Sequence, residues 1–368
     1  MLKVSGVKKL LVEVILAVVF CLAVVVLASH DDHFYTQPIF QIHRVINGKQ
    51  QKVVDEFHNV DHQTDQKLTG KIINGKYSGR TLTIQNTYSD SNAMDHKLAP
   101  GQKVFIALHT KPRLHATVKD LKRDVPIAIL FAIAISLLLI VLQFRGFVVI
   151  FSILVNTLLF WLAIRINERT NGAPVILIFS VLAVIFCALT LFLVMGWTKK
   201  MMVTLMAVVG STTATILIML LIFGFTQEKG VYYESMQYVT QLPKPLFLAE
   251  VLIGVLGAVM DEATDIVASL ATLKKEKPEM SRMQLFNSGR AIGRSIMGPL
   301  INVLFFIFMA ETFAMTILFL KNGNSWGYSF SMNMSLGMIS SLVSAIGIVL
   351  TVLLSSLFAG LWIKGDEK

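Results

Sequence analysis

The feature that most constrains this chain is a series of long apolar segments that begins near residue 125. A helix needs about 20 apolar residues to cross the hydrocarbon core of a bilayer, and these segments are of that length. Hydrophobic residues make up 54% of the chain and charged residues 15%, which is more apolar surface than a soluble domain can bury. The sequence therefore predicts a mostly α-helical integral membrane protein with a seven-helix transmembrane bundle over residues 125–368. The expected spans are Pro126–Phe144, Phe147–Ile164, Ala173–Met195, Met201–Phe225, Leu246–Leu273, Ser295–Leu320 and Leu336–Ile363.

A further apolar segment, Leu10–Leu27, follows three lysines near the start of the chain. It is just long enough to cross a bilayer, so we expect residues 1–28 to form an N-terminal signal-anchor transmembrane helix. The small residues around Ala28 leave a cleaved signal peptide as the alternative. With an uncleaved anchor, the chain has about eight transmembrane helices.

Residues 29–124 are the one long polar part of the sequence, and their pattern indicates β-structure. Leu68–Asn86 alternates apolar or β-branched residues with polar ones around Asn-Gly and Ser-Gly turns, which predicts a hairpin. Val104–Leu108 is a further short strand, and Asp90–Asp95 is an expected exposed loop. We expect a small extracytoplasmic β-rich domain, OB-like or barrel-like, inserted after the first helix.

All eight histidines of the chain fall in this polar segment. The pairs His30/His33 and His58/His62 have spacings that suit a metal ion, and histidine also titrates near neutral pH. However, histidine is disfavoured in lipid, and this alone gathers it wherever a membrane protein is polar. We therefore assign no metal ion and no cofactor.

The formal net charge of +10 does not indicate nucleic-acid binding, because the basic residues form no aromatic-interleaved patch. Cytoplasmic loops of membrane proteins carry an excess of Lys and Arg. With the N-terminus in the cytoplasm, fourteen basic residues fall inside and five in short outside loops. We therefore expect a cell-membrane protein with both termini cytoplasmic and residues 29–124 extracytoplasmic. The inside residues are Lys3, Lys8, Lys9, Arg145, Lys199, Lys200, Lys274, Lys275, Lys277, Arg282, Arg290, Arg294, Lys364 and Lys368; the outside ones are Arg165, Arg169, Lys229, Lys244 and Lys321.

Acidic residues interrupt the span Leu246–Leu273. Ionisable residues inside a membrane cost about 2.5–3.5 kcal/mol each on insertion scales, so they usually have a function or a partner. Glu250, Asp261 and Asp265 fall at about 0°, 20° and 60° around a helix, whereas Glu262 falls near 120°. We therefore expect the first three to share a polar face that excludes Glu262.

The next expected span follows two arginines and contains an asparagine. If it packs antiparallel with Glu250 beside Glu311, Arg294 and Asn302 come within about one turn of the carboxylates. The alternative is structural: the arginines follow the positive-inside bias, and the carboxylates are paired between helices. On the functional interpretation, the predicted substrate- or ion-coupling residues are Asp261, Asp265, Glu250, Arg290, Arg294 and Asn302.

Glycines and a proline accompany these arginines. Gly289 and Gly293 have the four-residue spacing that permits close approach of two helices. Gly298 followed by Pro299 interrupts the backbone hydrogen bonds and favours a kink, and broken helices facing a polar site recur in transporters. We expect packing or kink roles for these four residues, and a short amphipathic helix over Met280–Asn287 on the cytoplasmic surface.

The sequence contains no P-loop, zinc-protease, α/β-hydrolase or kinase signature and no evident nucleophile–base pair, so we predict no catalytic residue and no enzyme. The leading hypothesis is a transporter-like permease, or a component of one, with Asp261 as the coupling carboxylate. Its partners are then the lipid bilayer and either a second copy of the chain or a companion membrane subunit, without nucleic acid. The alternative is a non-transporting scaffold or sensor whose extracytoplasmic domain binds a ligand or a partner protein.

Two motifs, GVLGAVMDEATDIVASL at 254–270 and NSGRAIGRSIMGPLINVL at 287–304, resemble the YibE/F-like family of bacterial multi-pass membrane proteins. The order of anchor helix, β-rich domain and bundle is also similar. The resemblance implies that fold and a membrane location, and it brings no substrate or reaction. Asp261, Gly289, Gly293, Gly298 and Asn302 match recurrent positions of the family, whereas Ser295 stands where a further acidic residue is expected.

Overall fold

The structure is a computed structural model that describes residues 2–92, 95–109, 114–170, 175–236 and 243–363. The chain divides into two compact units, Met1–Gly146 and Phe147–Lys368. Three predicted features lie partly outside the described residues: the loop Asp90–Asp95, the start of the span at Ala173, and the C-terminal lysines Lys364 and Lys368.

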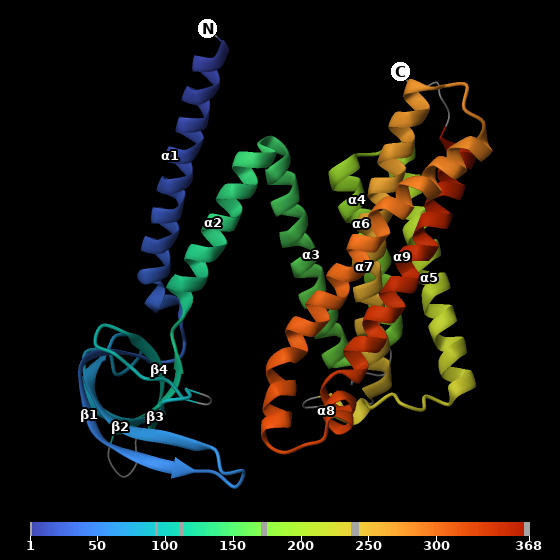
Figure 1. The fold of residues 1–368 in the computed structure, drawn as a ribbon. Helices are drawn as coiled ribbons and strands as arrows, with labels where there is room; N and C mark the ends of the chain where they lie inside the picture. Colours follow the sequence, from blue (N-terminus) through green and yellow to red (C-terminus); the bar gives the residue numbers. More distant parts are fainter. Residues whose placement is uncertain (1, 93–94, 110–113, 171–174, 237–242, 364–368) are drawn as a thin grey trace. The chain divides into compact units, whose positions relative to one another are not determined.

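The described part of the first unit contains two α-helices, one short 3₁₀ helix and five antiparallel strands (Figure 1). The strands lie in the order β3-β2-β1-β4-β5, and the two edge strands β3 and β5 also contact each other, so the sheet curls. Helices α1 and α2 pack against each other. The elements are α1 Leu2–Ser29, the short helix η1 Asp31–Phe34, β1 Ile39–Val54, β2 Val60–Ile72, β3 Thr81–Ser89, β4 Lys103–His109, β5 His115–Leu121 and α2 Asp124–Leu142.

The β-structure predicted from the sequence is confirmed in part. The hairpin expected over Leu68–Asn86 is formed by β2 and β3, with Leu68 paired to Ile84, and the strand expected at Val104–Leu108 is β4. The sequence does not predict β1 or β5. Beyond Ile42, β1 is mostly exposed on both faces, so it lacks the alternation that marks a half-buried strand.

One side of the sheet holds a hydrophobic core in which Phe40, Ile42 and Leu68 are completely buried. Burial of each such side chain contributes about 1.5–3 kcal/mol. The strands β1 and β2 approach closely at Gly70, where a Cβ atom would lie 2.1 Å from the backbone oxygen of Gln41. Only glycine fits at this position.

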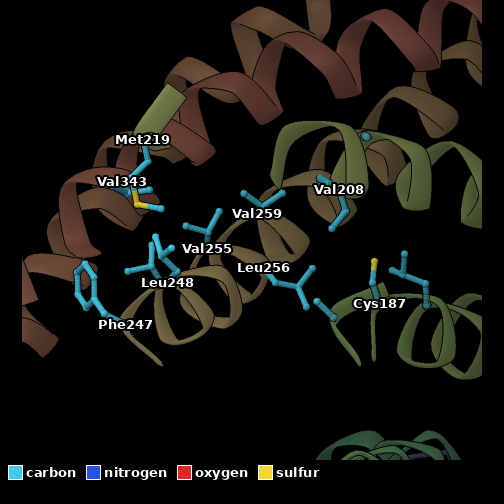
Figure 2. Packing of buried hydrophobic residues seen from close by; sticks show 14 of the residues in the cluster. Cys187, Val208, Met219, Phe247, Leu248, Val255, Leu256, Val259 and Val343 are labelled. Atoms are coloured by element: carbon cyan, nitrogen blue, oxygen red, sulfur yellow. The ribbon is translucent and has the colours of Figure 1, made fainter. Parts of the chain in front are cut away.

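The second unit is helical, and α6 packs against α4, α5, α7 and α9. Figure 2 shows its main hydrophobic cluster, in which Val255 and Val259 of α6 lie with Cys187 of α4, Met219 of α5 and Val343 of α9. The helices are α3 Phe144–Arg169, α4 Val175–Met195, α5 Lys199–Thr226, the short η2 Tyr233–Ser235, α6 Pro243–Glu276, α7 Arg282–Lys321, α8 Trp326–Asn333 and α9 Ser335–Trp362.

Within the described ranges, six helices are long and apolar enough to cross a membrane: α2, α3, α4, α5, α7 and α9. Helix α6 is not among them, and in α1 the segment Glu13–Ser29 counts as a shorter apolar helix. The membrane class is therefore supported, and of the eight expected spans six are found.

The separate surface helix expected over Met280–Asn287 is wrong. A capping box formed by Ser281 and Gln284 starts α7 at Arg282, and the helix continues through Pro299 to Lys321. The residues up to Asn287 therefore belong to the same long helix as the apolar stretch that follows. The helix continues through Pro299 because a proline removes only one backbone hydrogen bond, while the flanking residues remain helix-forming.

Candidate functional site on helix α6

Helix α6 has a side that packs in the bundle and a side that is free of it. The packed side recurs at helical spacing and includes Val255 and Val259, both completely buried. Glu250, Asp261 and Asp265 lie exposed on the other side. Their common side is the one that helical spacing predicts.

Helix α7 brings a further carboxylate to this side of α6. Glu311 lies close enough to Glu250 for the two charges to interact. Near the other end of the two helices, a Cβ atom at Gly289 of α7 would lie 2.9 Å from Cδ1 of Leu270 of α6. The two contacts run in opposite directions along the two helices, so α6 and α7 are antiparallel, as the predicted pairing of Glu250 with Glu311 requires.

The two arginines lie in the first half of α7. Arg290 is half-buried, with its guanidinium carbon 5.8 Å from the centre of the Phe286 ring, and Arg294 is exposed. Among the residues that the structure describes, no ion pair joins either arginine to Asp261 or Asp265. The predicted network of acids and arginines is therefore not closed in this conformation.

The other polar residues of α7 bond to their own helix. Asn302 is exposed, and its Nδ2 donates to the backbone oxygen of Gly298 over 3.0 Å. The Ser295 hydroxyl donates to the backbone oxygen of Ile292 over 2.6 Å. Both side chains therefore bond to the backbone of α7 near Pro299, and in the described structure neither bonds to a carboxylate of α6.

Gly289 and Gly293 lie where α7 packs on α9. A Cβ atom at Gly289 would lie 2.2 Å from the Ser356 hydroxyl oxygen, and one at Gly293 would lie 2.4 Å from Cγ1 of Val352. At Gly298, no atom outside its chain neighbours and its own helix turn lies within 4 Å of such a Cβ. The first two glycines are thus required by helix contact, and the third is not.

Glu262, which helical spacing excludes from the polar face, is the one acidic residue of the described chain that is completely buried. Neither of its carboxylate oxygens has a hydrogen-bond partner among the described residues. The sequence does carry a signal for this burial, because position 262 continues the stripe set by Val255 and Val259. Buried hydroxyls without a partner in the described structure accompany it in the bundle: Ser211 and Thr212 of α5 and Ser355 of α9.

A second charged cluster lies in the first unit, where the sheet meets α1 and α2. The Lys122 side chain is 3% exposed and forms ion pairs with Asp31 and with Asp124, the latter over 2.6 Å. Burial acts to lower the pKa of Lys122, but hydrogen bonds to Asp124 and Asp31 outweigh it, so the pKa is raised. Burial, with a hydrogen bond donated to Asp124, also raises the pKa of Tyr35.

The apolar helices, the curled sheet and the acid-bearing helix define a polytopic membrane protein with a β-sheet domain near its N-terminus. The chain belongs to the YibE/F-like family. The family model described as YibE/F-like protein matches residues 130–365, and that described as YibE/F family N-terminal domain matches residues 33–121. These matches confirm the resemblance of the two sequence motifs. Comparisons with curated proteins and with solved structures gave no match.

Proposed function

We propose that this chain is a transporter-like permease, or a subunit of one, in the cell membrane. In this proposal α1 and α6 complete a set of eight transmembrane helices, both termini are cytoplasmic, and residues 29–124 are extracytoplasmic. The strand order and the contact between β3 and β5 support an OB-like, partly open barrel for the sheet.

One observation carries the proposal: carboxylates are exposed on helices that otherwise suit a bilayer. Glu250, Asp261 and Asp265 of α6 and Glu311 of α7 are all exposed in the second unit. Ionised side chains facing lipid cost about 2.5–3.5 kcal/mol each on insertion scales, and simulations give more. Such a surface is stable in a membrane when it borders water or a companion subunit. The water-filled pathway of a permease provides the first, and a permease of several subunits provides the second.

The chemistry of this surface suits a positively charged cargo or coupling ion. Asp261 and Asp265 lie one helical turn apart, close enough for their charges to interact. Two such carboxylates in a poorly solvated place do not both ionise without a counter-charge. In the proposed mechanism Asp261 takes this positive charge, and Arg290 or Arg294 replaces it when the site is empty.

The test is ion flux into vesicles that contain the purified protein together with a trapped pH dye and a membrane-potential dye. We expect Asp261→Asn and Asp261→Ala to lower the flux at least tenfold at equal protein content. Glu279→Gln, a change of an exposed carboxylate outside the helices, serves as the matched control. Full flux in both Asp261 variants, together with unchanged growth of the cells that express them, would reject the proposal.

A sensor or scaffold is the second candidate, and the Lys122 cluster favours it. This lysine ties Asp31, just after α1, to Asp124 at the start of α2; in the sensor proposal, these ion pairs are the route by which ligand binding on the sheet reaches both helices. Deleting residues 35–120 while keeping the spans separates the two candidates. Retained flux with no loss of a bound partner argues against the sensor, whereas retained flux with loss of a bound partner supports it.

A further inference from the structure

Helices α5, α6 and α9 come together at Gly347 of α9. A Cβ atom at this position would lie 3.0 Å from Cγ2 of Val259 on α6 and 3.4 Å from the Thr215 hydroxyl oxygen on α5. Because glycine has no side chain, the backbones of the three helices approach one another closely here. Residues one turn further along each helix are therefore neighbours.

The direction of α6 relative to α9 follows from a second contact. Gly254 of α6 meets Ser340 of α9, with a Cβ-to-hydroxyl distance of 3.8 Å, and Val259 meets Gly347. From the first contact to the second, the residue numbers increase on both helices, so the two helices are parallel. About one turn further on, Glu262 of α6 comes level with Thr351 of α9.

Helix α5 runs the other way. Gly210 meets Leu354, with a Cβ-to-Cδ1 distance of 3.5 Å, whereas Thr215 meets Gly347. The residue one turn before Thr215 is Ser211, which therefore lies at the same level as Glu262. The packing places a carboxyl group inside the bundle with hydroxyl groups from two other helices.

The atoms of this layer have unused hydrogen-bonding capacity. Within the described chain, both Glu262 carboxylate oxygens and the Ser211 hydroxyl are buried without a partner, and so is the hydroxyl of Ser355, one turn beyond Thr351 on α9. In contrast, the Thr351 and Thr215 hydroxyls each donate to a backbone oxygen of their own helix over 2.7 Å. The unpaired oxygen atoms at this level can therefore bind a proton.

No positive charge in the described bundle offsets Glu262. Helices α4 and α9 contain no Asp, Glu, Lys, Arg or His, and the lysines of α5 lie at its start, about 16 Å along the helix from Ser211. Among the described residues, no ion pair joins Glu262 to the charged residues of α7, which are Arg282, Arg290, Arg294, Glu311 and Lys321. Asp265, on α6 itself, interacts with Glu262 as a like charge. An ionised carboxylate left alone in such a place is strongly destabilising.

We propose that Glu262 is a proton-binding site that exchanges its proton with water when the packing of α5, α6 and α9 loosens. In the packed state described here, one carboxyl oxygen carries the proton. On loosening, the O–H bond breaks, the proton passes to water, and the carboxylate is solvated. This inference rests on the proposed function and names the proton as the coupling ion.

A proton fits the layer better than a metal ion. A hard cation gathers six or more oxygens at about 2.0–2.6 Å, so its ligands lie close to one another. Here the Ser211 and Ser355 hydroxyls lie beyond hydrogen-bond distance of the carboxylate oxygens, and the described residues contain no cluster of three metal-ligating side chains. A proton needs one oxygen only.

Infrared spectroscopy of the full-length protein in lipid vesicles tests the site without any transport assay. At neutral pH we expect the carbonyl band of a protonated carboxyl group in the wild type and in Asp261→Asn, and its loss in Glu262→Gln. In D₂O the band should shift as the proton exchanges. An unchanged band in Glu262→Gln overturns the proposal, and so does a wild-type band that never shifts in D₂O.

Flux measurements on the same vesicles keep the two proposals distinguishable. If the band depends on Glu262 but no variant changes any flux, the permease proposal fails and the proton site stands. If Asp261→Asn abolishes flux while Glu262→Gln changes neither band nor flux, the proton site fails and the permease stands. Ser211→Ala should shift the band frequency more than Ser355→Ala, because the packing places Ser211 level with Glu262, whereas Ser355 lies one turn beyond Thr351.

Discussion

Asp261 and Glu262 are consecutive residues that lie in opposite environments: Asp261 is exposed, and Glu262 is completely buried. The rotation of about 100° per residue turns one carboxyl out of the bundle and the other into it. The outer carboxyl is free to meet an ion without any rearrangement of the bundle. The inner one meets water only if helices move.

Removing the inner carboxyl should stabilise the fold. We expect Glu262→Met to raise the free energy of unfolding of the detergent-solubilised protein by about 1–3 kcal/mol, because an apolar side chain of similar volume replaces a buried group without a partner. Thermal unfolding followed by tryptophan fluorescence measures this change. Flux should be lost in the same variant.

Asp261→Met is the matched control, and its free energy of unfolding should stay within about 0.5 kcal/mol of the wild type because the side chain is exposed. If Glu262→Met instead lowers the stability by more than about 2 kcal/mol, Glu262 holds a bonding role in the fold.

The contact between α7 and α9 should be sensitive to a single methyl group. We expect Gly293→Ala to destabilise the protein by about 1–3 kcal/mol, because the added Cβ would lie 2.4 Å from Val352. Chemical unfolding of the purified protein gives the free energy. Val352→Ala in the same chain should recover part of the loss, since it removes the atoms that collide.

Gly298→Ala makes the control for this contact. Outside its own helix turn and chain neighbours, no atom lies within 4 Å of a Cβ there. Alanine is favoured over glycine inside a helix by about 1 kcal/mol, but Pro299 disfavours a Cβ on the residue before it. The two effects oppose each other, so stability should change by less than it does in Gly293→Ala. Equal destabilisation by the two alanine variants would show that the close packing at Gly293 is not the cause.

Local periodicity was enough to predict the outer polar side of α6. The positions of Glu250, Asp261 and Asp265 follow from the helical repeat, and the pairing of Glu250 with Glu311 follows from two antiparallel neighbours. The residues level with Glu262, Ser211 and Thr351, lie on helices distant in sequence, so no local pattern could reveal them.

The start of α7 shows a different kind of error. Pro299 and the charged residues before it suggest a break, yet the S-x-x-Q pattern at Ser281–Gln284 already marks a helix start. Strand β1 escaped prediction because its outer half is held by pairing with β2 rather than by a buried face. Cross-strand partners decide such segments, and they are set only in the folded sheet.

In the sheet, Gly70→Ala should separate β1 from β2. The new Cβ would lie 2.1 Å from the Gln41 backbone oxygen, so the ladder has to open locally at a cost of about 1–3 kcal/mol. Limited trypsin digestion of the whole protein should then cut faster at Arg44. Gly48→Ala, whose Cβ would lie 3.3 Å from the nearest atom, should change the rate little. Equal protection in both variants would contradict the tight register.

The Lys122 cluster predicts an alkaline limit to the stability of the first unit. The pKa of Lys122 is raised above its ordinary value of 10.5 in the folded chain, so its pairing is fully present below that pH and is lost as pH rises through the folded pKa. Tyr35, whose pKa is raised above 10.0, acts in the same direction. Thermal unfolding between pH 8 and about pH 12 should therefore show a decline in melting temperature at the alkaline end.

Lys122→Met should remove most of this alkaline decline and should lower stability at neutral pH by about 3–5 kcal/mol, because Asp31 and Asp124 lose their shared counter-charge. Lys119→Met, a change at an exposed position of β5 three residues before Lys122, should leave the pH profile as in the wild type. Tyr35→Phe should keep the decline in weaker form. An identical alkaline decline in the wild type and in Lys122→Met would show that Lys122 does not fasten the sheet to α1 and α2.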